Sequence, residues 1–151
     1  MDDANQLQPL VDSIEQIFLE CSAEQKPSEE LIHRLEQIKL RWKENCEPHE
    51  IGRPEYLITE YMHVNRIMQN DIFIRYAVEA YESCCELKMW HAVCVVCERV
   101  LEMFFYMESL SDVGKRDAEK WFRHWSAAAE QWMETAQPEG EHWSEMGTAF
   151  L

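Results

Sequence analysis

The sequence has little glycine, little proline and little positive charge. Only 4 of its 151 residues are glycine and 5 are proline, which is too few for a collagen-like, linker-like or turn-rich all-β chain. The glycines stand alone, so no glycine-rich loop is available to hold a phosphate group. Lysine and arginine total 14 against 29 aspartates and glutamates, which gives a formal net charge of −15. An overall charge this negative argues against direct binding to a nucleic-acid backbone.

Long hydrophobic runs are also missing. The most apolar stretch, residues 92–107, is interrupted by Glu98, Arg99 and Glu102 and is shorter than the roughly 20 apolar residues of a membrane-spanning helix. The acidic N-terminal segment lacks the basic and apolar regions of a secretory signal. We therefore expect no membrane association and an intracellular location, in the cytoplasm or nucleus. The 6 cysteines are expected to be reduced thiols in that environment.

Apolar residues recur at helical spacing in six successive segments. Pro9 suits the first position of the first helix, and Ser28 suits the N-cap of the second. The basic residues of the second helix are expected to face water, and these are Arg34, Lys39, Arg41 and Lys43. The remaining helices are predicted to begin at Pro54, after Asn70 or Asp71, near Trp90 and near Lys115, and the last to end at Ala136.

Two of these helices carry specific predictions about burial. The third is predicted to pack through Leu57, Tyr61, Val64 and Met68, with Ile58, Met62 and Ile67 widening that face. The fifth, residues 90–107, is apolar on nearly every side, which places it at the centre of the fold or in an oligomer interface. Residues 92–97 also fit a short buried strand, but no second segment offers to pair with it, so a helix is favoured.

The predicted fold is an all-α, compact bundle of about six helices arranged as antiparallel hairpins. Residues 1–137 are assigned to one domain, and residues 138–151 to a C-terminal tail that docks on the domain or binds a partner. The turn between Leu87 and Trp90, with Tyr81 and residues 97–102, resembles a tetratricopeptide-type helical hairpin. This similarity covers less than a quarter of the chain. The glycine expected in such a hairpin is absent and no second copy follows at the 34-residue period, so the similarity identifies no family.

Motifs for catalysis are absent, and metal binding is a weaker alternative. The chain has no G-x-S-x-G and no H-E-x-x-H sequence, and its carboxylates fall mostly on polar helix faces, so we predict no enzymatic activity. Cys84, His91, Cys94 and Cys97 are residue types that bind zinc. Buried free cysteines more often serve as small core residues. The preferred prediction is therefore no metal and no other cofactor, with a zinc-stabilised regulator as the alternative.

Tryptophan is the most informative residue type, because it is enriched where one protein anchors another. At helical spacing, the tryptophans of residues 115–136 most simply pack on the core. However, that helix and the tail carry more apolar surface than one core needs. The predicted partner-binding residues are Trp121, Phe122, Trp125, Trp132, Met133, Trp143, Met146, Phe150 and Leu151.

These residues predict a non-catalytic protein–protein interaction module, such as an adaptor, scaffold subunit or regulator. An aromatic face with an acidic rim would bind a protein that has a basic or apolar groove, because complementary charge favours such an encounter. A homodimer and an obligate hetero-complex both remain open. An acidic nucleic-acid mimic that blocks a basic groove is a further alternative.

Overall fold

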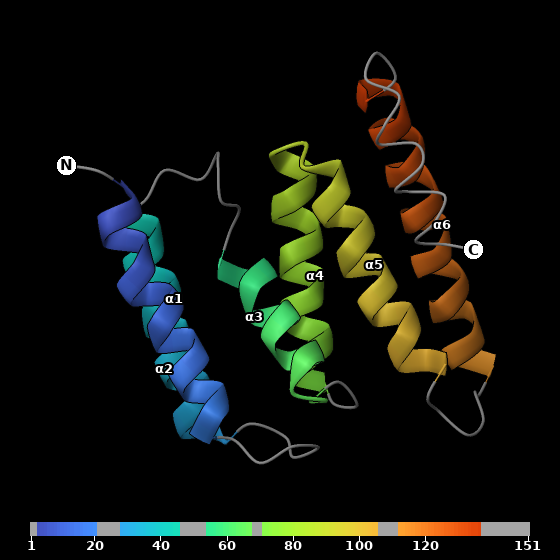
Figure 1. Ribbon diagram of the computed structural model, residues 1–151. Helices are drawn as coiled ribbons and strands as arrows, with labels where there is room; N and C mark the ends of the chain where they lie inside the picture. The colour runs from blue at the N-terminus through green and yellow to red at the C-terminus, as the bar shows by residue number, and fades with distance from the viewer. Residues whose placement is uncertain (1–2, 21–27, 46–53, 68–70, 106–111, 137–151) are drawn as a thin grey trace.

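The computed structural model describes residues 3–20, 28–45, 54–67, 71–105 and 112–136, and nearly all of them are helical. No strand occurs in these ranges, which confirms the predicted all-α class. The six helices are α1 (Asp3–Glu20), α2 (Glu29–Asn45), α3 (Pro54–Val64), α4 (Asp71–Glu86), α5 (Trp90–Phe105) and α6 (Asp112–Ala136) (Figure 1). Over the part of the chain that is described, no helix is long and apolar enough to cross a bilayer.

The helices form three antiparallel pairs that lie side by side (Figure 1). The pairs are α1 with α2, α3 with α4, and α5 with α6, and α4 also packs directly on α5. The odd-numbered helices form one layer, because α3 contacts both α1 and α5. The even-numbered helices are linked by side chains, such as Lys39 with Glu79 and Tyr81 with His124. This arrangement confirms the predicted antiparallel hairpins and resembles the stacked helix pairs of α-solenoids.

The stacking has a spatial repeat that the sequence does not show. Contacts between neighbouring pairs join residues separated by 40 positions at Lys39–Glu79, 39 at Glu60–Arg99 and 43 at Tyr81–His124. Each contact uses different residue types, ion pairs in two cases and a phenol with an imidazole in the third. A search for similar residues at a fixed period therefore finds no repeat, although these three contacts span similar lengths of chain.

Helix α5 packs between α4 and α6 and also contacts α3. Val93, Val96, Cys97 and Val100 are fully buried, and they recur at the three- and four-residue spacing of a helical face. The helical rather than extended conformation of residues 92–97 is thus confirmed. The middle pair of the fold is α3 with α4, and α5 makes no close backbone contact with α1 or α2 in the described part of the chain, so the predicted position of α5 at the centre of the fold is not confirmed.

Some of the predicted helix ends are confirmed by the structure and others are wrong. Ser28 caps α2 as predicted, since its Oγ accepts a hydrogen bond from the Leu31 N–H at 3.2 Å. Helix α1 begins at Asp3, so Pro9 lies inside it and not at its first position. Beyond the first turn, a proline removes one backbone hydrogen bond and crowds the carbonyl four residues earlier, yet α1 continues through Pro9. Helix α6 begins at Asp112, before the predicted start near Lys115, and its first turn includes Gly114.

The buried face of α3 differs from the predicted one. Ile58 and Met62 are fully buried, whereas Val64 is 71% exposed, and Leu57 and Tyr61 are half-buried. Because α3 contacts α4 and α5 as well as the first pair, the residues that widen the predicted face become its centre. Ile67 is buried as predicted, and Met68 lies outside the described residues.

Two charged residues are buried although polar helix faces were expected to hold them in water. Lys39 is only 8% exposed and Glu55 only 4%. The Lys39 Nζ lies 2.7 Å from Glu79 Oε2, 3.2 Å from Glu36 Oε2 and 3.9 Å from Glu55 Oε1. The placement of Lys39 in water was therefore wrong, because carboxylates from three helices replace the solvent around its ammonium group.

Helices α3 and α4 end in the same way, with a residue in the left-handed backbone region. Arg66 has φ 60° and Lys88 has φ 57°. The N–H of Ile67 donates to the Met62 carbonyl at 2.8 Å, and that of Met89 donates to the Cys84 carbonyl at 2.9 Å. Each of these hydrogen bonds closes a turn of six residues, which is typical of the Schellman motif. The second turn connects α4 directly to α5 without a longer loop.

Candidate functional site

The tryptophan stripe predicted on α6 is divided by the structure into a buried part and a surface part. Trp121 is only 6% exposed and packs edge-on against Tyr81, with ring centroids 5.7 Å apart at 76°. The Tyr81 hydroxyl also lies 3.0 Å from His124 Nδ1. Trp121 therefore attaches α6 to α4, which is the core-packing role that helical spacing favours, and offers little surface to a partner.

The other predicted residues of α6 lie nearer the surface. Trp125, Trp132 and Met133 are partly buried and pack against the core. Phe122 is 56% exposed, and its ring centroid lies 5.7 Å from that of Trp125. The predicted tail residues fall outside the described residues, and these are Trp143, Met146, Phe150 and Leu151. The predicted domain boundary at 137/138 also falls there.

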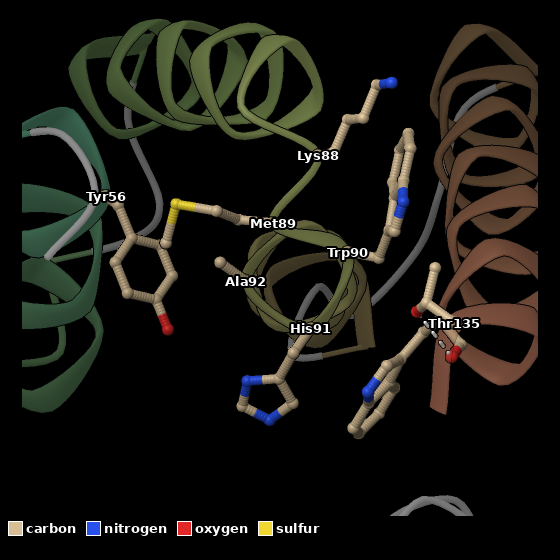
Figure 2. Close-up of a pocket in the computed structure, with 8 residues that line it drawn as sticks. Tyr56, Lys88, Met89, Trp90, His91, Ala92 and Thr135 are labelled. Carbon is tan, nitrogen blue, oxygen red and sulfur yellow. Dashed lines mark hydrogen bonds between the residues drawn. The ribbon is translucent and has the colours of Figure 1, made fainter. Parts of the chain in front are cut away.

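A recess of about 350 Å³ lies where the first turns of α3 and α5 meet the last turns of α6. Aromatic rings from all three helices line it: Tyr56 of α3, Trp90 of α5 and Trp132 of α6 (Figure 2). The imidazole of His91 stands edge-on to Trp132, with centroids 4.7 Å apart at 65°. The lining is completed by Lys88, Met89, Ala92 and Thr135.

The sequence identifies one of these lining residues, Trp132, as a partner-binding residue. His91 appears there only in the alternative zinc group, and Trp90 only as the start of the most apolar helix. Helix α4 and two connecting turns separate Tyr56 from His91 in the sequence, so no short sequence pattern contains both residues. Their proximity is produced by the packing of α3 on α5 and by the tight turn at Lys88, which a motif search cannot detect.

The recess itself is lined by no carboxylate, but acidic residues act on one of its lining residues, Tyr56. Burial, followed by the negative charge of Glu60, raises the pKa of Tyr56 to about 12, and Glu98 also raises it. Burial raises the pKa of the Glu98 carboxyl, and Glu102 and Glu60 add to this effect against the opposing charge of Arg99. We call Glu60, Glu98 and Glu102 the carboxylate strip, and it extends along α3 and α5 from Tyr56.

Arg99 forms ion pairs with two of the three glutamates of the carboxylate strip. Arg99 Nε lies 3.1 Å from Glu60 Oε1, and its Nη1 lies 3.9 Å from Glu102 Oε2. His63 Nε2 also lies 2.7 Å from Glu102 Oε2. Among the described residues, Glu98 takes part in none of these salt bridges.

The cysteines do not form a metal-binding group in the described part of the chain. Cys84, Cys94 and Cys97 are buried, and His91 is exposed and faces Trp132. Burial raises the pKa of Cys94 to about 12 and that of Cys97 further still. Zinc binding and thiol redox chemistry both need the thiolate. No set of three or more histidine, cysteine or acidic side chains among these residues is placed to hold a metal ion.

Comparisons with protein-family models, with curated proteins and with solved structures find no match to this chain. Its function is therefore inferred from the chemistry of the recess and of the surface around it.

Proposed function

We propose that this chain is a non-catalytic protein–protein interaction module, an adaptor, scaffold subunit or regulator that works inside the cell, in the cytoplasm or nucleus. The observation that carries the proposal is the recess formed by Tyr56, Trp90 and Trp132 (Figure 2). Concave apolar sites with a few polar groups are the usual places where ligands and anchor residues bind. Here three aromatic side chains are presented by three helices of one packed core, so the recess is formed before a partner arrives.

The lining residues favour binding over catalysis. The titratable groups of the recess are one imidazole, one amine and one phenol, from His91, Lys88 and Tyr56. With a pKa of about 12, the phenol keeps its proton at neutral pH and is a poor base. The Thr135 hydroxyl donates its hydrogen bond to the Trp132 carbonyl at 3.0 Å and not to a basic side chain, which is the arrangement that activates a hydroxyl as a nucleophile.

The predicted aromatic face of α6 contributes to this proposal through two separate surfaces. Trp132 lines the recess, whereas Phe122 lies on the surface beside Trp125. Trp132 and Phe122 are ten positions apart, so single substitutions can tell which surface a partner uses. Gln131 is exposed and adjoins Trp132 in sequence, which makes Gln131→Ala a matched control.

The test is affinity capture from cell extract followed by mass spectrometry. The baits are the full chain, its Trp132→Ala, Phe122→Ala and Gln131→Ala variants, and a chain ending at Gln137. We expect a partner that is retained by Gln131→Ala and lost with Trp132→Ala, at salt concentrations that suppress weak charge contacts. Loss of the partner only from the bait that ends at Gln137 would show that the partner binds the tail and not the recess. Failure of every bait to retain a partner would contradict the proposal.

The same capture experiments distinguish the proposed interaction module from the alternative, an acidic nucleic-acid mimic. Such a mimic would bind a basic groove mainly through surface charge, so its partner should dissociate as salt rises. The amount of that partner captured should also be unchanged by Trp132→Ala. A partner held at high salt in a Trp132-dependent way supports the aromatic recess instead.

A further inference from the structure

We propose that residues 138–151 fold back on the same molecule and place the Trp143 side chain in the recess, so that a partner must displace this segment before it can bind. This inference rests on the proposed function and adds a regulation to the same site. It assigns the recess to an acidic segment of the chain itself that carries an aromatic anchor.

The segment leaves the helical body directly at the recess. Trp132 and Thr135 from the last turns of α6 line the recess, and α6 ends at Ala136. Trp143 follows Ala136 by seven positions, and seven residues can span at most about 23–25 Å. The residues between them include a proline and a glycine, which favour turns. The indole of Trp143 therefore needs only a reversal of chain direction to meet walls that its own helix helps to form.

The walls of the recess suit a large aromatic side chain. Tyr56, Trp90 and Trp132 present rings from three helices, and aromatic rings favour offset or edge-on contact with one another. The volume of about 350 Å³ lies at the lower end of the range for ligand sites, so the recess suits a single side chain and not a helix. Trp143 is the first tryptophan, tyrosine or phenylalanine after α6, which makes it the nearest candidate.

The charges of the lining suit an acidic segment. Lys88 and His91 belong to the lining, which includes no carboxylate. The first turn of α5 contains no acidic residue, so the partial positive charge of this helix N-terminus is not offset within the turn. Residues 138–151 contain three glutamates and no lysine or arginine. The segment therefore brings negative charge to a surface whose charge complements it.

The carboxylate strip restricts the direction from which this segment can enter. Glutamates of the strip act on Tyr56, whereas Figure 2 shows Thr135 on the opposite side of α5 from Tyr56, with His91 between them. An acidic segment is repelled by the strip and should approach past His91. That approach starts beside Thr135, where the chain leaves the last turn of α6.

The tethered segment has an advantage over other occupants of the same chemistry. A short linker holds a segment near its site at an effective concentration in the millimolar range. The same segment of a second copy would instead bring a whole molecule with a net charge of −15 towards another of equal charge. Occupation within one molecule is therefore favoured over exchange between two.

The first experiment observes the recess in the full-length chain by NMR. The indole N–H signals of Trp42, Trp90 and Trp132 are assigned by replacing each tryptophan with phenylalanine. Trp143→Ala should shift the signals of Trp90 and Trp132, because a neighbouring ring leaves the recess. The signal of Trp42, which is buried in α2, should not move. Signals of Trp90 and Trp132 that stay in place would overturn the proposal.

The second experiment tests the charge complementarity. Lys88 is exposed, and Lys88→Glu should release the acidic segment. In that background, Trp143→Ala should therefore shift the Trp132 signal less than it does in the unaltered chain. Lys115→Glu is the matched control, because it makes the same charge change on an exposed lysine at the other end of α6, and it should leave the effect of Trp143→Ala intact. Equal results in the two backgrounds would overturn the proposal.

The third experiment adds the segment as a separate molecule. A fluorescent peptide of residues 138–151 is titrated by anisotropy against the full-length chain and against its Trp143→Ala variant. The variant should bind the peptide at least about tenfold more tightly, because the unaltered chain presents its own competing segment. Adding Trp132→Ala to the variant should weaken binding, as expected for loss of an aromatic wall. Equal binding by the unaltered chain and the Trp143→Ala variant would overturn the proposal.

Dilution separates occupation within one molecule from exchange between two. The signals of Trp90 and Trp132 should be independent of protein concentration, and movement towards their Trp143→Ala positions on dilution would overturn the proposal. Failure here is distinguishable from failure of the proposed function. A cellular partner captured through Trp132 in an amount that does not rise with Trp143→Ala would leave the interaction module intact and its recess unregulated.

Discussion

Lys39 shows how a single buried charge can join helices from neighbouring pairs. Its ammonium group lies among carboxylates of α2, α3 and α4, closest to Glu79 at 2.7 Å, and it stands 5.4 Å from the centroid of the Tyr76 ring. Burial lowers the pKa of Lys39, but its hydrogen bond with Glu79 and the charges of Glu79 and Glu36 outweigh that effect, so the pKa is raised. The lysine is therefore charged throughout the neutral range.

Replacing this lysine should remove the closest positive charge from the buried Glu55 carboxylate and from Glu79, leaving only the more distant and half-exposed Lys43 beside Glu55. We expect Lys39→Met to reduce the free energy of unfolding by roughly 3 kcal/mol, as is typical when one partner of a buried ion pair is removed. Lys43→Met is the control, because Lys43 is half exposed and lies 4.0 Å from the same Glu55, and it should cost little. Urea denaturation of both variants at pH 7 makes the comparison.

The control for the mechanism is a double variant. If Glu55, whose Oε1 lies 3.9 Å from the lysine, is one source of the penalty, Glu55→Gln should recover part of the stability lost in Lys39→Met. Strictly additive effects of the two substitutions would contradict the coupling described here.

At the level of elements, the ends of α3 and α4 are formed by local hydrogen bonds and not by glycine. Arg66 and Lys88 occupy the left-handed position of the two terminal turns. A side chain with a Cβ atom is strained in this region by about 1–2 kcal/mol. The terminal hydrogen bond of α3 joins the backbones of Ile67 and Met62, and both side chains are buried. Apolar burial at these two positions commonly accompanies the Schellman motif and offsets such strain.

Glycine at the end of α3 should stabilise the protein. Arg66→Gly removes the Cβ strain at φ 60°, and we expect the free energy of unfolding to rise by about 1 kcal/mol, measured by urea denaturation. Arg66→Ala removes the same charge but keeps the Cβ atom, so it should give no comparable gain. An equal gain from alanine would attribute the effect to charge and contradict the conformational explanation.

At the scale of the whole molecule, the core contains ionisable groups that fold in their neutral forms. Burial raises the pKa of Cys94 and of Tyr81 to about 12, and that of Cys97 further. In the unfolded chain the thiols ionise near pH 9 and the phenols near pH 10. The folded state thus retains protons that the unfolded state releases in alkaline solution, which links stability to pH.

The stability of the fold should therefore be unaffected by these groups below pH 8 and should fall as the pH rises from 9 towards 11. Urea denaturation at a series of pH values measures this slope. Cys97→Ala should lower stability at pH 7 by creating a small cavity, but its stability should depend less steeply on pH between 9 and 11. An unchanged slope in that variant would show that Cys97 does not contribute.

The sequence predicted the individual helices better than it predicted which helices pack against one another. Periodicity located α5 and the Ser28 cap because both depend on residues a few positions apart. The burial of Lys39 and the face of α3 depend on which helices lie beside them, and that information is spread over about 40 residues of chain. The recess was missed for the same reason: Trp132 was identified by its spacing, but Tyr56 and His91 become its neighbours only through tertiary packing.

The side-by-side arrangement of the pairs has a mechanical consequence. Among the described residues, α1 and α2 make no close backbone contact with α5 or α6, so each interface joins only adjacent pairs. In stacked architectures of this kind, stability is a sum of local terms. A pulling force applied between α1 and α6 would load these interfaces in series, and the molecule would lengthen pair by pair as the weakest interface yields first.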